Sequence, residues 1–432
     1  MNRKTFLKTS AAGALVAGGV AFGAPSSIAK TRIKITKVLP IPIKANRDTG
    51  ATGWMLVRVQ TDQGVEGIGE GFPLQSRSLP NIAEIRRTIE SIGTRLVGTS
   101  PLDIEGFLNR FASDAAATNS GESMGALFQV EPLGEPQGKR SAGPPSVNWV
   151  TAISAIEIAL WDIAGQVAGL PIHALLGGRL RQSIPIYANH GVFNALEQDT
   201  QERFDRAIRL KEAGFKMFKW DPFRSYGNPG LAEVKKYVKE VQVFRDGFGP
   251  DYLLAIDVHT KFNLEGALRV VKELEPFNLV FLEEPIPPGR SDQFRKISDS
   301  TSIPLAAGER MMTRREAKEL LDSGAIQVIQ PEIGNFGGIL AGRQTAALAE
   351  LYNVKVAMHS WCSPVLCRAA AHVSATIPNL LAQEYPAIAP EYPWEREMLD
   401  PPTEIRNGEI VLTDRPGLGS KLNEKLIASR LL

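Results

Sequence analysis

Three acidic residues that each follow an apolar run could together hold a divalent cation. Asp257 ends the run LLAID, Glu283 ends LVFLE, and Glu309 follows IPLAAG. One such acid would more often be a helix cap or a surface ion-pair partner. Three at the ends of successive strands are different, because the carboxyl ends of parallel strands meet at one mouth of a barrel. Mg²⁺ prefers oxygen ligands of this kind, so the spacing predicts a Mg²⁺ site.

Two histidines near the ends of such runs could transfer protons. His259 lies two residues beyond Asp257, so the two side chains would share one face of an extended strand. His359 ends the run VKVAMH, and Glu332 ends the preceding run IQVIQPE. A carboxylate that accepts a hydrogen bond from one imidazole nitrogen leaves the other nitrogen as a general base. The sequence therefore predicts a Glu332–His359 dyad near the metal site.

Four further polar residues end predicted strands and could face a substrate. Lys219 and Asp221, in MFKWD, are two residues apart and would also share a face. Asp221 could bind a substrate hydroxyl or pair with Lys219. Glu384 ends the run LLAQE, and His190 ends IPIYANH, where it could line the pocket or serve only the structure. These side chains would complete the rim of one pocket.

Eight strand-like runs in the second half of the chain would position all of these residues. Amphipathic helix patterns separate most of them, for example at 201–213, 233–244 and 314–321. Eight parallel strands that alternate with helices predict an α/β fold, a (β/α)8-type barrel. An open doubly wound sheet is the alternative, but no Gly-x-Gly-x-x-Gly follows a strand. The runs are 184–190, 217–221, 253–259, 279–285, 303–309, 326–332, 354–360 and 380–385.

The remainder of the chain divides around that barrel. Residues 31–38, 54–60 and 65–68 alternate apolar and polar side chains, as half-buried antiparallel strands do. The stretch 112–146 has no sustained period and is expected to form a long loop. We therefore predict an α+β capping domain over 30–148, the barrel over 149–400, and a tail over 401–432 that returns to the capping domain.

The first 29 residues have the features of an export signal peptide. Arg3, Lys4 and Lys8 form a basic start, an Ala/Gly-rich apolar run follows, and Ser27-Ile28-Ala29 is a small-x-small cleavage site. The start resembles a twin-arginine signal with Lys4 in place of the second arginine, so the general export route and a disordered tail stay as alternatives. We expect a periplasmic protein with no membrane span after signal removal. The net charge of +2 gives no reason to expect a nucleic-acid partner.

The motifs as a set resemble the enolase superfamily and, within it, the mandelate racemase subgroup. KxD, DxH, EEP, GER, QPE, MHS and QEY follow one another in strand order, after GVEGIGEG and SAIEIALWDIAG. The likeness covers essentially the whole chain after the leader and is greatest to acid-sugar dehydratases of the galactonate dehydratase type. Members share a first step, in which a base removes the proton α to a carboxylate and Mg²⁺ stabilises the enediolate.

The resemblance implies a role for the metal and base residues. Asp257, Glu283 and Glu309 would bind Mg²⁺. His359, oriented by Glu332, would abstract the α-proton. The family normally has Asp where this chain has Glu332, so the longer side chain would either keep the dyad or turn away into an ion pair and leave His359 less basic.

The resemblance also implies roles for three residues on the other strands. His259 would be the general acid that expels a β-hydroxyl as water, and Glu384 would bond the enediolate oxygen. Lys219 would neutralise the substrate carboxylate. Members with a second lysine at the place of Asp221 use it as a base, so a symmetric two-base racemase is disfavoured. The implied enzyme is a homo-oligomeric hydro-lyase that makes a 2-keto-3-deoxy acid from a sugar acid.

Loops of the capping domain would choose the substrate. We expect the loops near 45–54 and 71–79 to close over the pocket, with Arg47, Trp54 and Arg77 facing the distal hydroxyls. Each could equally be an ordinary exposed loop residue. Two other functions stay open. One is a cycloisomerase that acts on an anhydro acid or lactone, and the other is an exported sugar-acid-binding protein without catalysis.

Overall fold

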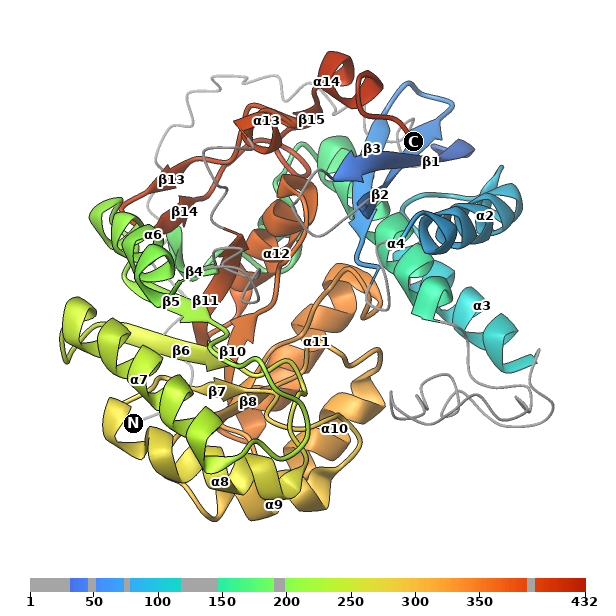
Figure 1. Cartoon of the computed structure of the whole chain (residues 1–432). Helices are drawn as coiled ribbons and strands as arrows, with labels where there is room; N and C mark the ends of the chain where they lie inside the picture. Colours follow the sequence, from blue (N-terminus) through green and yellow to red (C-terminus); the bar gives the residue numbers. More distant parts are fainter. Residues whose placement is uncertain (1–31, 46–51, 74–77, 118–146, 190–198, 387–392) are drawn as a thin grey trace, which may run out of the picture.

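A closed barrel of eight parallel strands forms the centre of the protein (Figure 1). The computed structural model describes residues 32–45, 52–73, 78–117, 147–189, 199–386 and 393–432. Neighbouring strands pair in chain order, and the last pairs with the first, with Gln383 opposite Ile186. This closure confirms the predicted barrel. The strands are β4 (Ser183–Asn189), β5 (Met217–Trp220), β6 (Leu253–Asp257), β7 (Leu282–Glu283), β8 (Leu305–Ala307), β9 (Val328–Ile329), β10 (Lys355–Met358) and β11 (Leu380–Pro386).

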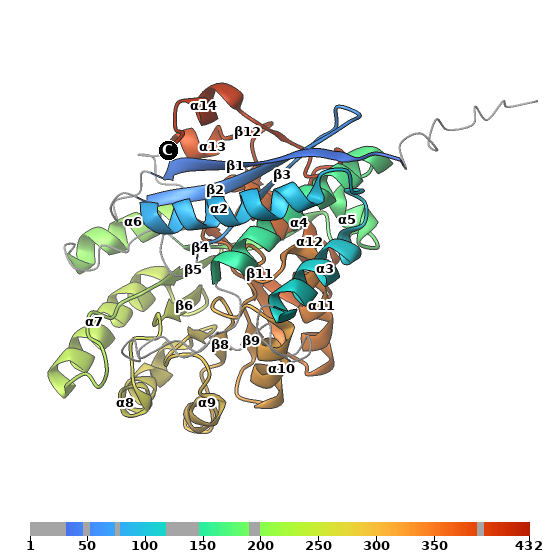
Figure 2. The same cartoon turned by 90° about the vertical axis from the view of Figure 1, so that its right-hand side faces the viewer.

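Seven helices connect these strands and cover the outside of the barrel (Figures 1 and 2). Their sequences are amphipathic: in the third, Val270, Val271 and Leu274 are buried, and the Asn263 side chain caps the first turn. The first helix that the structure describes after β11 is the four-residue α13 (Pro393–Arg396). The seven are α6 (Thr200–Glu212), α7 (Leu231–Phe248), α8 (Leu264–Leu274, followed by the 3-10 turn η1, Glu275–Phe277), α9 (Ser291–Ser298), α10 (Arg314–Asp322), α11 (Gly338–Leu351) and α12 (Pro364–Thr376).

The N-terminal region forms a capping domain beside the barrel (Figure 2). Its three strands make an antiparallel sheet in the order β1-β2-β3. Buried residues of this sheet pack with those of the helices to form a second core, which includes Met55, Val57, Ile89 and Phe111. The elements are β1 (Ile35–Ala45), β2 (Thr52–Thr61), β3 (Glu66–Gly71), α2 (Leu79–Leu96), α3 (Ile104–Ala117), α4 (Val147–Ala168) and the short α5 (Ile172–Leu175).

Three alternate glycines allow β3 to lie directly against helix α4. A Cβ atom added at Gly69 would lie 2.1 Å from the carbonyl oxygen of Ala155, and the positions of Gly67 and Gly71 are similarly close to the helix backbone. Side chains of a strand alternate between its two faces. The glycines therefore occupy the helix-facing side, and Glu70 points the other way, toward the barrel.

The C-terminal tail contacts both domains. Strand β14 (Glu409–Val411) pairs with β4 of the barrel and with β13 (Ile405–Arg406). Strand β12 (Leu399–Asp400) pairs with β15 (Lys421–Leu422), and α14 (Glu424–Ala428) follows. At the end of the chain, the Leu432 N–H donates to the Pro42 carbonyl of β1. The return to the capping domain is thus only the last part of the path.

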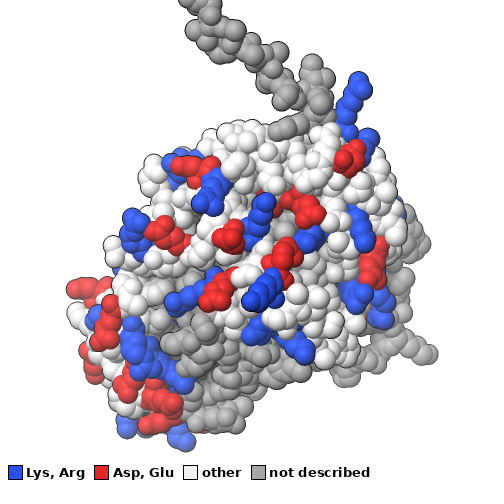
Figure 3. Space-filling view, turned by 90° about the horizontal axis from the view of Figure 1, so that it is seen from above, with Lys and Arg blue, Asp and Glu red and all other residues white. Residues whose placement is uncertain are grey.

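The surface and the one long apolar helix bear on possible partners. Positive and negative side chains are interspersed on the face seen in Figure 3, in keeping with the nearly balanced net charge. Among the described residues, α4 is the one helix long and apolar enough to cross a membrane, and 78% of its most apolar window is buried inside the protein. It packs against β3 and α11, as a core helix does.

Candidate active site

The polar residues of the barrel lie in a layer above an apolar floor. Seven of the floor residues are Tyr187, Met217, Ala255, Phe281, Val328, Ala357 and Ala382. Each of these lies two residues before a polar residue of the layer, which are Asn189, Lys219, Asp257, Glu283, Gln330, His359 and Glu384. Because side chains two residues apart on a strand share a face, the strand period itself places the polar layer at the mouth of the barrel.

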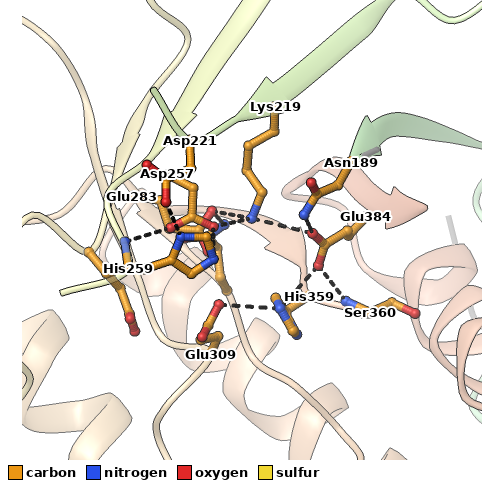
Figure 4. Close-up of polar contacts among 12 residues, drawn as sticks. Asn189, Lys219, Asp221, Asp257, His259, Glu283, Glu309, His359, Ser360 and Glu384 are labelled. Carbon is orange, nitrogen blue, oxygen red and sulfur yellow. Dashed lines mark hydrogen bonds and ion pairs between the residues drawn. The ribbon is translucent and has the colours of Figure 1, made fainter. Parts of the chain in front are cut away.

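Asp257, Glu283 and Glu309 converge as the sequence predicts (Figure 4). One carboxylate oxygen from each lies within 4.8 Å of the others, and all three side chains are buried. Oε1 of Glu283 accepts no hydrogen bond from the described residues. Burial and the charge of Asp257 raise the pKa of Glu283 well above its usual value. A hard oxygen donor set with an unused buried oxygen fits Mg²⁺.

The Lys219 ammonium lies among these carboxylates. Nζ is 3.0 Å from Oδ2 of Asp257, 2.6 Å from Oε2 of Glu283 and 3.3 Å from Oε1 of Glu384. Burial alone would lower the pKa of Lys219, but these acids raise it well above its usual value. A permanent positive charge at this point can attract the carboxylate of a substrate.

Glu332 keeps the dyad with His359 despite its extra methylene. Its Oε2 lies 2.8 Å from Nδ1 of His359, and its Oε1 accepts a hydrogen bond from the Gly334 N–H. The alternative, in which Glu332 turns away, is not observed. The contact fixes the imidazole ring so that Nε2 faces Glu309 of the acidic triad.

The Nε2 atom of His359 meets two further carboxylates. It lies 3.3 Å from Oε2 of Glu309 and 3.2 Å from Oε2 of Glu384. Burial disfavours the charged ring, but Glu384 and Glu309 raise the pKa of His359 well above its usual value. Glu384 is itself held by the Ser360 N–H and the Asn189 amide.

His259 reaches the site from a loop, and not from the strand that the sequence predicts. Strand β6 ends at Asp257, and His259 has a left-handed backbone with φ 54°. Its Nδ1 lies 2.8 Å from Oδ2 of Asp221, and its Nε2 lies 3.4 Å from Oδ2 of Asp257. Burial disfavours the imidazolium, but the two aspartates raise the pKa of His259 to about 9.

Asp221 contacts different partners from those that the sequence suggests. It lies just past β5, and its Oδ2 binds both His259 and the ammonium of Lys261. Its Oδ1 accepts a hydrogen bond from the Phe223 N–H. A pairing of Asp221 with Lys219 was one expectation, but Lys219 instead binds Asp257 and Glu283. Asp221 therefore orients the imidazole of His259.

The expected capping-domain contacts are only partly described. Arg47, Arg77 and His190 lie outside the described residues. The expectation that Trp54 belongs to a loop over the pocket is wrong. Trp54 lies in β2 and is fully buried, with its ring 5.7 Å from that of Trp394, because apolar strand residues pack inward.

Sequence reasoning missed several polar residues of the site. Arg310 binds both Glu284 and Glu309. The positive charges of Arg310 and His359 lower the pKa of Glu309 well below its usual value, against the effect of burial. The Gln330 amide donates to Glu283. Both residues stand beside site acids in the motifs GER and QPE, so their position was a usable signal. Lys261 lies in a loop, and no motif in the sequence indicated its place in the site.

Family models match both parts of the chain. One described as "Mandelate racemase / muconate lactonizing enzyme, N-terminal domain" matches residues 30–177, and one described as "Enolase C-terminal domain-like" matches 202–426. The second alone covers more than half of the chain. Together the two matches include the capping domain, the barrel apart from its first strand β4, and most of the tail.

Full-length relatives agree with the family models. D-xylonate dehydratase of Haloferax volcanii is 31% identical over 391 residues, which cover 88% of this chain and 85% of that protein. D-galactonate dehydratase of Cronobacter sakazakii is 30% identical over 388 residues, which cover 87% of this chain and 91% of that protein. A mandelate racemase/muconate lactonizing enzyme-like protein of known structure from Rubrobacter xylanophilus has a TM-score of 0.80 and 29% identity, with 93% and 98% covered. The chain therefore belongs to the mandelate racemase/muconate lactonizing enzyme family of the enolase superfamily.

Proposed function

We propose that this protein is a Mg²⁺-dependent dehydratase that converts a sugar acid to a 2-keto-3-deoxy acid. The observation that carries the proposal is the pair of imidazoles at the acidic triad. Each Nδ1 binds a carboxylate, of Glu332 or Asp221, and each Nε2 lies within 3.4 Å of a triad acid. One ring can accept a proton while the other donates one, as an elimination of water requires.

The names of the relatives support the same reaction class. They are dehydratases of D-xylonate, D-galactonate and, in Thermoproteus tenax, D-gluconate. All three substrates are aldonates, with a hydroxyl on the carbon next to the acidic C–H. We therefore place an aldonate first among the substrates to test.

The residues divide the reaction between binding and proton transfer. Lys219 holds the substrate carboxylate at the floor of the mouth. Mg²⁺ bound by Asp257, Glu283 and Glu309 would supply positive charge beside that carboxylate and neutralise the acids that face His359. Nε2 of His359 then removes the proton from C2, with Glu332 stabilising the imidazolium.

The second half of the reaction releases water. The electron pair of the broken C2–H bond forms a C2=C3 double bond as the C3–O bond breaks. Nε2 of His259 donates its proton to the departing hydroxyl, which leaves as water. The resulting enol gains a proton at C3 and becomes the 2-keto-3-deoxy acid.

The test uses the Mg²⁺-loaded protein and a panel of aldonates, aldarates, uronates and anhydro acids in D₂O. NMR would follow deuterium at C2 and C3, and mass spectrometry would follow loss of water. We expect water loss with deuterium at C3 for at least one aldonate, and no reaction with the His359→Asn variant as the matched control.

Two other outcomes would contradict the proposal. Deuterium gained without water loss would indicate an isomerase. No exchange with any acid, combined with equilibrium binding of one of them, would indicate a sugar-acid-binding protein.

A further inference from the structure

The end of strand β3 in the capping domain contacts the segment that follows the base. The Glu70 carboxylate is fully buried, and Oε1 accepts a hydrogen bond from the Ser363 N–H (3.1 Å). Oε2 accepts from the Ser363 hydroxyl and from the Leu366 N–H (3.0 Å). Ser363 is the N-cap of α12, so Glu70 ties the first turn of this helix to the capping domain. Only three residues separate His359 from that cap.

Phe72, the residue just after β3, contacts His359 directly and reaches Glu332 through Gly334. The Phe72 N–H donates to the Gly334 carbonyl (2.9 Å), and the Gly334 N–H donates to Oε1 of Glu332 (2.8 Å). The Phe72 ring lies edge-on to the imidazole of His359, with 5.5 Å between centroids. A Cβ atom at Gly334 would lie 2.8 Å from the Phe72 nitrogen, so this approach requires a glycine.

Glu70, in β3, and Phe72, just after its last residue Gly71, both contact the barrel. Glu70 and Phe72 are two residues apart and face the barrel, while the glycines between and before them rest on α4. The end of β3 therefore packs against α4 on one side and contacts two loops of the barrel on the other. One loop follows Glu332 and the other follows His359.

We infer that Glu70 and Phe72 are positioning residues for the Glu332–His359 dyad, so that the capping domain contributes to proton abstraction as well as to substrate choice. Glu70 holds the segment that follows His359 in place. Phe72 holds the loop that follows Glu332 and sets the orientation of the imidazole ring. This inference deepens the proposed function, but the hydrogen bond between the two dyad residues can be measured without any substrate.

The first experiment observes that hydrogen bond by NMR. The full-length, Mg²⁺-loaded protein is labelled with ¹⁵N-histidine, and the hydrogen-bonded Nδ1–H of His359 is assigned by its loss in His359→Asn. We expect Glu70→Ala to shift or broaden this resonance, and Glu70→Gln to have a smaller effect because one acceptor oxygen stays. Phe72→Leu should shift the ring signals of His359, because the neighbouring aromatic ring is removed.

Glu316→Ala is the matched control. Glu316 also accepts a backbone N–H, from Met312, and a hydroxyl, from Thr313, at the start of a barrel helix. It touches neither dyad residue in the described contacts. Its loss should destabilise the fold by a comparable mechanism and leave the His359 resonance in place.

The second experiment measures exchange of the α-proton of a turned-over aldonate with D₂O. Misplacement of a reacting group by about 1 Å can cost roughly 100-fold in rate, so we expect a loss of that order in kcat for Glu70→Ala, with KM changed less. An unchanged resonance and rate in folded Glu70→Ala, or equal losses in Glu316→Ala, would overturn the inference. If no acid is turned over by the wild type, the proposed function fails, and the resonance alone decides the role of Glu70.

Discussion

Nδ1 of His259 lies 2.8 Å from Oδ2 of Asp221, a residue at the end of the neighbouring strand. The same aspartate also binds Lys261, which fixes its carboxylate. His259 has a left-handed backbone, a conformation that costs about 1–3 kcal/mol and persists where the surroundings enforce it. Asp221 thus orients the imidazole of His259 through Nδ1, as Glu332 orients that of His359.

Asp221→Asn should slow the loss of water far more than the exchange of the α-proton. The variant removes the charge that holds His259 as a proton donor, and general acid catalysis contributes about 100-fold or more. Simultaneous NMR of deuterium at C2 and of product would separate the two steps. Equal losses in both would show that His259 is not specific to the departure of the hydroxyl.

Glu332→Asp should lower the exchange rate, although it restores the residue that the family normally has. The shorter side chain withdraws the carboxylate by about 1.5 Å from a contact that is now 2.8 Å long. A loss on the order of 100-fold is expected from such a displacement. Exchange at the wild-type rate would mean that the backbone moves to compensate, which a crystal structure of the variant would reveal.

Glu283→Gln should abolish the stabilisation of the fold by Mg²⁺. A ligand at a hundredfold its Kd adds about 2.7 kcal/mol of stability, so thermal unfolding of the wild type should shift upward with added Mg²⁺ after chelation. The variant lacks one of the three carboxylates and should show little shift at the same concentration. Glu316→Gln, outside the triad, should retain the full shift.

Glu157→Gln should change how the stability of the fold depends on pH. The Glu157 carboxylate accepts hydrogen bonds from the Ile339 and Leu340 N–H groups at the start of α11. Burial raises its pKa from 4.5 to about 7. A raised pKa in the folded state contributes stability that is fully present below pH 4.5 and is lost as the pH rises through about 7.

The difference in the free energy of unfolding between wild type and Glu157→Gln should therefore fall by on the order of 3 kcal/mol across that range. Urea denaturation at a series of pH values between 4 and 8 would measure it. A difference that does not vary with pH would mean that Glu157 stays ionised in the folded state.

The strand period made the barrel and its polar layer predictable. Asp257 and Glu283 end paired strands and Glu384 lies within β11, and the rule that alternate residues share a face places each of them correctly. The same rule gave a wrong partner for Asp221, which lies beyond the end of β5. It placed His259 beside Asp257 correctly, with 3.4 Å between Nε2 and Oδ2, but His259 reaches that point from a loop with positive φ angles and not from β6. The alternation of side chains along a strand does not predict where the side chains point after the last paired residue.

Other features depended on contacts between distant segments. The partner of Trp54 is Trp394, 340 positions later, and neither residue alone shows whether it is buried. The position of Glu70 was easier to predict from the sequence, because the alternate glycines of GVEGIGEG indicate a strand with one face against a backbone. Export of the protein and the roles in catalysis stay predictions until they are measured.

Lys219 also has a consequence for how the acidic triad would take up the proposed Mg²⁺. The ammonium of Lys219 neutralises part of the negative charge of Asp257 and Glu283. It would therefore reduce the repulsion between these carboxylates when no cation is bound. The same ammonium competes with an incoming cation for those oxygens. In the proposed enzyme, Lys219 would therefore lower the affinity for Mg²⁺ and allow the protein to fold before the metal binds.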